Sequence, residues 1–180
     1  MKSISKGIIG AAMMAAFGLS HAAGPIYYTV DGGPVQQLDV NPITDTFVGS
    51  STVTAGLCSI GCTLSATGTL SDVIGGNTTL SVTNASVSGG LLCGAVSLSG
   101  FPWDGSVAHA SIPSPLAPVT FTLNNVAVSA PICGNCSSQI DVTFDPANGG
   151  SFEFNGPITP NGNCRVVGSL TSDHYYDAWH

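Results

Sequence analysis

The chain has very few basic residues. Its 180 residues include three Lys and Arg against ten Asp and Glu. Lys2 and Lys6 lie in an N-terminal segment that we expect to be removed, which leaves Arg165 as the one basic residue of the mature chain. Binding to nucleic acid or to an anionic membrane surface depends on clustered Lys and Arg side chains. The sequence therefore predicts neither a nucleic-acid partner nor electrostatic attachment to a membrane.

Catalytic and metal-binding signatures are also missing. The sequence contains no G-x-S-x-G, H-E-x-x-H or P-loop motif. Of the histidines, His109 lies in an alternating stretch that predicts a surface or edge position, and His174 and His180 lie near the C-terminus. The acidic stretches 39–45 and 141–150 do not match an EF-hand loop and are interpreted as Asx-type turns. We predict no catalytic residue, no metal, no cofactor and no enzymatic activity.

Long hydrophobic runs are limited to the N-terminus. An apolar run over residues 7–19 follows the two lysines and precedes the small residues Ser20 and Ala22. The run is too short to span a membrane, and this pattern is typical of a secretory signal peptide. We therefore predict a signal peptide over residues 1–22, a secreted protein, and no membrane span.

Charge of either sign is scarce, at 7% of residues, whereas apolar residues make up 43%. The apolar share argues against a disordered chain. Ser, Thr, Asn and Gly must then cover the surface, and such a neutral surface weakens the repulsion that keeps proteins apart. This composition therefore predicts that the protein associates with other copies of itself.

The pattern that is present repeats every two residues. Apolar side chains alternate with polar ones in the stretches 119–124, 140–145 and 151–155, and more loosely in 78–88. This alternation predicts strands with one buried and one wet face. Turn-forming residues separate about nine such runs, so we predict an all-β protein with a single β-sandwich or jelly-roll-like domain. We place that domain at residues 46–180, after an N-terminal extension with a first strand at 23–45.

Six cysteines, an even number in an exported chain, indicate disulfides. Two close pairs occur, in CSIGC at 58–62 and CGNC at 133–136. The alternatives are a zinc site, for which about 70 residues between the pairs is a long separation, and a redox centre, for which a helix should follow the CGNC segment. We favour local disulfides within each pair, which leaves Cys93 to pair with Cys164, among the 15 connectivities that six cysteines allow.

Aromatic side chains gather at two places that could make contacts. Phe101 and Trp103 lie beside turn residues in SGFPWDG, where closing one end of the core is the simpler role. Tyr175, Tyr176 and Trp179 lie in the acidic C-terminal tail. The tail is open to contact with a neighbour, a surface or its own domain.

The segment after the expected cleavage site has a strand pattern. Ile26, Tyr28 and Val30 alternate with Tyr27, Thr29 and Asp31 over residues 26–31. A strand at this position could add to the sheet of a neighbouring copy, which would build a fibre. It could also complete the sheet of its own chain. Deletion of residues 24–30 distinguishes the two, because only donation to a neighbour predicts loss of assembly from a domain that still folds.

Three stretches resemble a known bacterial family. They are LSVTNASVSGGLLCGAVSLSGFPW, PVTFTLNNVAVSAP and GSFEFNGPITPNGNCRVVGSL. With Cys93, Pro102–Trp103 and Cys164 they resemble the protein activator of alkane oxidation (Pra) family over residues 46–170. The resemblance implies a small secreted protein linked to hydrocarbon assimilation and to biofilm or surface material. It implies no catalytic residue.

Two functions are compatible with these features. The first is a structural role at the cell surface or in biofilm matrix, including that of a self-assembling fibre subunit. The second is a secreted accessory protein that binds or solubilises hydrophobic compounds such as alkanes. The first follows from the neutral surface and the disulfides, and the second follows from the family resemblance.

Overall fold

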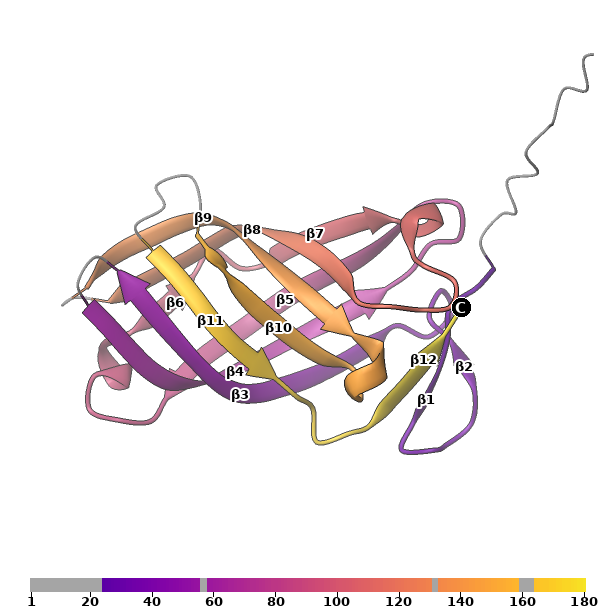
Figure 1. Cartoon of the computed structure of the whole chain (residues 1–180), viewed down its shortest axis with the longest axis horizontal. Helices are drawn as coiled ribbons and strands as arrows, with labels where there is room; N and C mark the ends of the chain where they lie inside the picture. Colours follow the sequence, from indigo (N-terminus) through magenta and orange to yellow (C-terminus); the bar gives the residue numbers. More distant parts are fainter. Residues whose placement is uncertain (1–23, 56–57, 131–132, 159–163) are drawn as a thin grey trace, which may run out of the picture.

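The computed structural model describes residues 24–55, 58–130, 133–158 and 164–180, so the expected signal peptide lies outside the described residues. Within these ranges the chain forms twelve β-strands and three short 3-10 helices. The all-β fold that the alternation predicts is confirmed (Figure 1). The 3-10 helices are η1 (Cys93–Ala95), η2 (His109–Ser111) and η3 (Pro146–Asn148).

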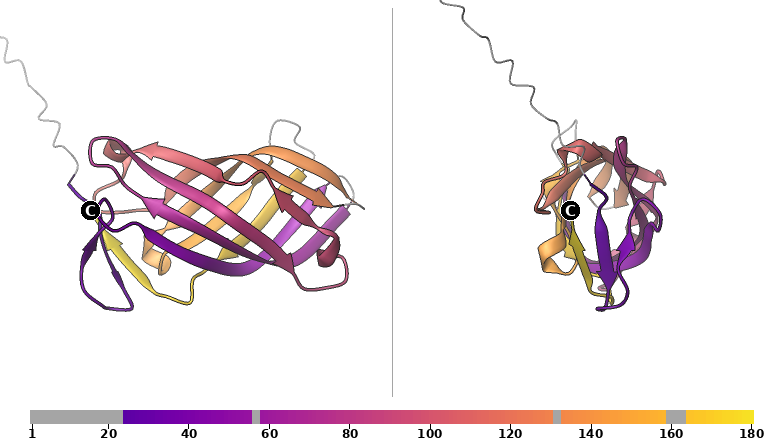
Figure 2. Two further views of the ribbon diagram at one scale, coloured as in Figure 1. Left: turned by 180° about the vertical axis from the view of Figure 1, so that it is seen from behind. Right: turned by 90° about the vertical axis from the view of Figure 1, so that its right-hand side faces the viewer.

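Nine strands form one antiparallel sheet. In spatial order they are β6 (Ser97–Ser99), β8 (Val119–Ala130), β9 (Gly134–Asp145), β10 (Ser151–Pro157), β11 (Cys164–Leu170), β3 (Ile43–Ala55), β4 (Cys58–Ser71), β5 (Asn77–Ser88) and β7 (Trp103–Ala108). The sheet curls until its two edges meet, and the layers expected of a sandwich are the opposite walls of this one sheet (Figure 2).

The sheet closes through two edge strands that are consecutive in the sequence. β6 pairs with β8 at one edge and β7 pairs with β5 at the other, so residues 100–102 carry the chain across the junction. Gly100 has a φ of 86°, and a Cβ there would lie 2.0 Å from the Asn125 carbonyl oxygen. Only glycine fits this crossing. Beyond it, Asn124 Nδ2 donates to the Asp104 carbonyl oxygen at 2.9 Å and joins β7 to β8.

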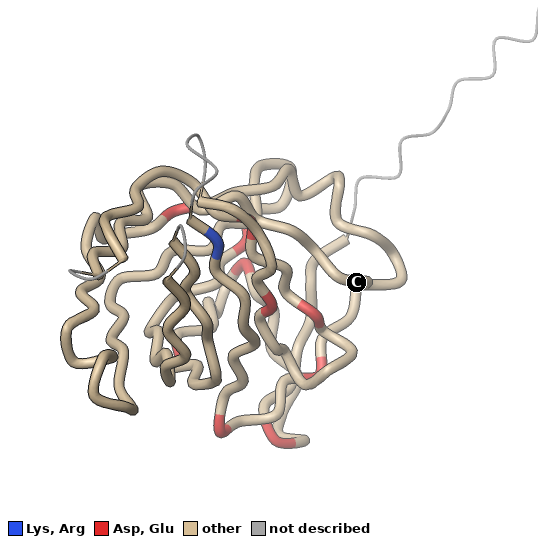
Figure 3. Tube along the Cα trace, turned by 60° about the vertical axis from the view of Figure 1, so that its left-hand side comes forward, with Lys and Arg blue, Asp and Glu red and all other residues tan. Residues whose placement is uncertain are grey.

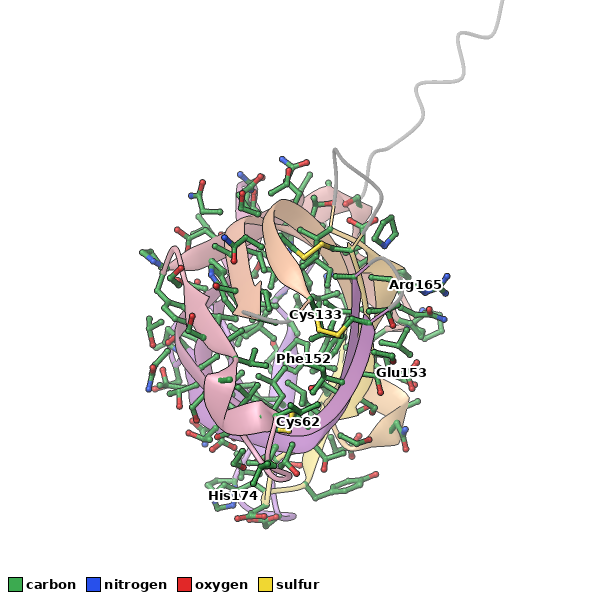
Figure 4. The ribbon with its side chains drawn as sticks, turned by 90° about the vertical axis from the view of Figure 1, so that its left-hand side faces the viewer. Cys62, Cys133, Phe152, Glu153, Arg165 and His174 are labelled. Atoms are coloured by element: carbon green, nitrogen blue, oxygen red, sulfur yellow. A yellow bond between two sulfur atoms is a disulfide. The ribbon has the colours of Figure 1, made fainter. Side chains whose placement is uncertain are left out.

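The inward residues of the alternating strands form the core. The apolar members predicted to face inward on β5, β8, β9 and β10 are all buried: Leu80, Val82, Val119, Phe121, Leu123, Ile140, Val142, Phe144, Phe152 and Phe154. A view into the curled sheet places Phe152 inside and Glu153 and Arg165 outside (Figure 4). Threonine hydroxyls pair across strands on the outer face, as between Thr120 and Thr143 at 2.9 Å. Threonine therefore supplies the neutral polar exterior that the composition predicts.

A second, three-stranded sheet covers one end of the curled sheet. It contains β12 (Tyr176–Trp179), β1 (Tyr27–Val30) and β2 (Gln36–Gln37), in that order. β1 pairs with β12 of the same chain, so the first and last strands of the described chain lie side by side (Figure 1). The N-terminal strand thus pairs within its own chain.

We call the end covered by this small sheet the capped end. In the part of the chain that the structure describes, no helix has the length and apolar character needed to cross a membrane.

Candidate hydrophobic cavity

The curled sheet encloses an apolar cavity of about 100 Å³. Every strand of the main sheet contributes to its wall, because the inward positions of each strand point to the same interior. Its lining residues are Ile43, Phe47, Ser51, Val53, Leu64, Ala66, Gly68, Leu70, Leu80, Val82, Val87, Leu98, Trp103, Leu123, Val126, Val128, Ile140, Val142, Phe144, Phe152, Phe154, Val166, Leu170 and Tyr176.

The polar groups on this wall are already hydrogen-bonded within the protein. Ser51 donates to the Cys62 carbonyl oxygen at 3.3 Å, and Trp103 Nε1 donates to the Ser99 carbonyl oxygen at 2.8 Å. The Tyr176 hydroxyl donates to Asp45 Oδ2 at 2.7 Å. These are the side chains with polar hydrogens on the described wall, so the cavity offers no free side-chain donor to a ligand. A polar molecule would lose its hydrogen bonds to water on entering, whereas a hydrocarbon has none to lose.

The volume of the cavity restricts what it can hold in this conformation. Pockets for drug-sized ligands measure about 300–1,000 Å³, whereas an engineered apolar cavity of about 150 Å³ stays dry and binds benzene. The cavity here, at about 100 Å³, fits a short hydrocarbon or one segment of a longer chain. A longer ligand requires the walls to separate.

Tyr176 divides this cavity from the capped end. Its buried ring contacts Phe47 at a centroid distance of 6.4 Å and also lines a second apolar cavity of about 30 Å³ below the small sheet. Burial and the hydrogen bond to Asp45 raise the pKa of Tyr176 far above its usual value. Asp45 also accepts from the Ser172 hydroxyl and the Thr46 amide. Burial opposes ionisation of Asp45, but these hydrogen bonds prevail and lower its pKa.

The opposite end of the sheet carries all three disulfides, and we call it the disulfide end. Cys58 pairs with Cys133, Cys62 with Cys93, and Cys136 with Cys164. The prediction that all six cysteines are paired is confirmed, since no described cysteine is free. Cys133 and Cys62 mark two of these bridges at the rim of the sheet (Figure 4).

The predicted connectivity was wrong in all three pairs. Cys58 and Cys62 lie on the same strand, β4, and strand residues four apart are separated by about 13 Å, well beyond the roughly 7 Å that a disulfide spans between Cα atoms. Cys136 likewise lies in strand β9, beyond the reach of Cys133. Each cysteine therefore bridges to a neighbouring segment, with Cα–Cα distances of 5.3–6.0 Å.

The aromatic residues singled out in the sequence have separate roles. Trp103 is buried, lines the cavity and stacks on Phe101 with ring centroids 4.4 Å apart, which is the core-closing role expected of that pair. In the tail, Trp179 stacks on Tyr27 at 6.1 Å, whereas Tyr175 is 58% exposed. The tail thus packs on its own domain.

His109 is a second correction to the sequence prediction. The helix η2 turns it inward, so it is 1% exposed instead of lying on the surface. Its Nδ1 lies 2.9 Å from Asp72 Oδ1, and the Thr78 hydroxyl donates to the same oxygen at 2.6 Å. The hydroxyl of Thr78 is directed at the carboxylate and not at the imidazole, so the three groups are not arranged as a nucleophile and its base.

Comparison with known proteins gives one match. No curated protein and no solved structure matches the chain significantly. Residues 1–178 match the family described as alkane oxidation protein activator PraA/PraB-like. This match covers nearly the whole chain and agrees with the resemblance noted in the sequence. The chain therefore belongs to the PraA/PraB-like family of alkane oxidation protein activators.

Proposed function

We propose that this protein is a secreted, non-enzymatic accessory protein that takes up hydrocarbon molecules in the cavity of its curled sheet. The observation that carries the proposal is the wall of that cavity, which is mainly apolar and whose polar side chains are hydrogen-bonded within the protein. The family, named for activation of alkane oxidation, supports a ligand of the same class. Three disulfides support an extracellular location, because such bonds persist in oxidising compartments.

Binding to an alkane would be driven by burial of its methylene groups. Each buried methylene contributes about 0.8 kcal/mol. Filling an apolar cavity that holds no water also gains van der Waals contacts, because its lining atoms lack contact partners until a ligand fills it. Such a protein would bind alkane, keep it dispersed in water and release it again. None of these steps needs a catalytic group.

The structural role at a cell surface or in biofilm stays a prediction. Its suggested mechanism was donation of the N-terminal strand, and that strand pairs with β12 of its own chain. The edge strands of the small sheet, β2 and β12, have two and four residues. Such short edges are poor templates for adding a neighbour.

Titration of the protein with dissolved hexane, followed by methyl NMR, tests the proposal. We expect saturable shifts of the lining methyl groups of Val128, Ile140 and Val166. The compound 1,6-hexanediol should give none, because one hydroxyl would have to be buried without a partner. Hexane binding without saturation, or equal binding of the diol, would contradict the proposal.

A cavity-filling variant sharpens this test. Ala66 lines the cavity and is buried, so Ala66→Leu places a larger apolar side chain in the empty volume. We expect this variant to keep or raise its melting temperature while its hexane affinity falls by about tenfold or more. Thr63→Leu, at an exposed position of the same strand, is the matched control and should bind hexane like the parent protein.

A further inference from the structure

One stretch of the cavity wall is partly exposed to solvent. Of the lining side chains, Leu64, Val87 and Leu98 are only partly buried, whereas the rest of the described wall is buried. Val87 pairs with Leu64 across β5 and β4, and Leu98 lies on β6. The exposed part of the wall is thus confined to one place, toward the disulfide end.

The same place is a gap in the hydrogen bonding of the sheet. β7 pairs with β5 only over Asn77–Val82, and β6 pairs only with β8. The second half of β5, residues 83–88, therefore lies next to β6 with no ladder between them in the described structure. We call this unpaired junction the β5–β6 seam. Two walls without a ladder separate at lower cost than hydrogen-bonded strands, because no backbone hydrogen bonds are broken.

Two exposed leucines lie on the turn that bridges the seam. Leu91 is fully exposed and Leu92 is 44% exposed. The turn is fixed directly after them, since the buried Cys93 is bonded to Cys62 and its amide donates to the Gly90 carbonyl oxygen at 2.9 Å. A single exposed leucine needs no explanation, but here a cross-linked turn presents an adjacent pair beside the open part of an apolar cavity.

Charge is distributed so that this end can meet an apolar phase. Seven of the ten acidic residues belong to the capped end: Asp31, Asp39, Asp45, Asp72, Asp145, Asp173 and Asp177. The turn at residues 89–96 carries no charged residue. Figure 3 marks the acidic residues in red and the basic residue of the described chain in blue along the chain trace. Contact between the Leu91–Leu92 turn and oil would therefore desolvate no charge of the turn, whereas the acidic end stays in water.

We propose that the Leu91–Leu92 turn docks the protein on the surface of liquid hydrocarbon, with the capped end toward water, and that hydrocarbon passes through the β5–β6 seam into the cavity. This inference rests on the proposed function, since it names the surface from which the cavity is filled. The surface that the turn contacts is neutral oil, and not an anionic membrane or a second copy of the chain.

Adsorption of the oxidised full-length mature protein to hexadecane droplets tests this proposal. We compare it with Leu91→Ser/Leu92→Ser and with a matched control, Val73→Ser/Ile74→Ser. The control pair is also adjacent, apolar and exposed, at 62% and 46%, but it lies on the β4–β5 turn near Asp72. We expect the leucine variant to lose adsorption by about tenfold or more and the control to adsorb like the parent protein. Equal adsorption of the leucine variant would overturn the proposal.

Dissolved hexane separates docking from cavity binding. The leucine variant should bind dissolved hexane with unchanged affinity and melt at an unchanged temperature, because the cavity wall is intact and both leucines are exposed. If no variant binds hexane but adsorption still depends on the leucines, the proposed function fails and the docking surface stands. Binding to anionic vesicles, or a dimer in sedimentation experiments that the leucine substitutions dissociate, would assign the turn to another occupant and overturn the proposal.

Discussion

Single residues keep the cavity apolar by directing polar atoms away from it. Tyr176 and Trp103 line the wall with their rings, but their donors reach Asp45 and the Ser99 carbonyl. Each ring thus adds apolar surface to the cavity while its polar atom stays hydrogen-bonded. Asp45 is the acceptor that holds Tyr176 in place between the cavity and the capped end.

The pH dependence of stability at acidic pH should therefore involve Asp45. Its pKa is lowered in the folded protein, so its contribution is present above the unfolded pKa of about 4 and is lost as pH falls through the folded value. We expect Asp45→Asn to lower the free energy of unfolding near neutral pH, and the difference from the parent protein to shrink below about pH 4. Urea denaturation across pH measures both.

Glu153→Gln controls for the change in net charge, because Glu153 is on the outward face of β10. It should leave the acid limb of the stability curve unchanged. A difference between Asp45→Asn and the parent protein that is constant down to about pH 2 would show that Asp45 is not the group responsible.

At the scale of elements, alternation predicted the strands but not their neighbours. The inward positions of β8, β9 and β10 follow directly from the period of two. Disulfide connectivity depends on which strands are adjacent and in what register, and hydrogen-bond partners far apart in sequence determine both. For this reason the sequence did not predict the disulfide between Cys136 and Cys164. It also did not predict that His109, on a turn between two strands, is buried against Asp72.

The Cys62–Cys93 bridge should matter for both stability and docking. It closes a segment with a sequence separation of 31, which corresponds to about 3–4 kcal/mol in the chain-entropy model. We expect Cys62→Ser/Cys93→Ser to lower the free energy of unfolding by up to this amount and to weaken adsorption to hexadecane, because the leucine turn loses its anchor. Chemical denaturation and the droplet assay measure the two effects. Unchanged adsorption would show that the turn needs no fixed geometry.

Deletion of residues 24–30 should destabilise the chain itself. It removes the ladder between β1 and β12 and the buried side chains of Ile26 and Tyr28, which cover the capped end. We expect a lower melting temperature by circular dichroism, since loss of a buried side chain commonly costs about 2–5 kcal/mol. A truncated protein that melts like the parent but no longer assembles would instead support the hypothesis that the N-terminal strand is donated to a neighbouring copy.

Across the whole molecule, the capped end is acidic, whereas the disulfide end carries Arg165 but no acidic residue in its described part and has the seam on its side. The sequence shows the ten acids and the six cysteines, but seven of the acids gather at one end only because the topology brings residues 31–45, Asp72 and Asp145 to the same end as residues 173–177. The sequence does not predict the seam either, because the seam is the place where β5 and β6 lie side by side without a hydrogen-bond ladder.

This polarity predicts how adsorption to oil responds to salt. The docking turn has no charge to screen, and seven of the ten acids belong to the capped end, at the opposite end of the sheet. Exposed charges separated by more than about 10 Å are largely screened at about 0.1 M salt. Adsorption to hexadecane should therefore change little when sodium chloride is raised from about 0.05 M to 1 M. Sodium sulfate should strengthen adsorption, because excluded salts favour apolar burial. Adsorption isotherms of the parent protein and of Leu91→Ser/Leu92→Ser in both salts provide the measurement. A steep loss of adsorption with sodium chloride would instead show that charged groups hold the protein on the droplet, which would contradict docking through the uncharged turn.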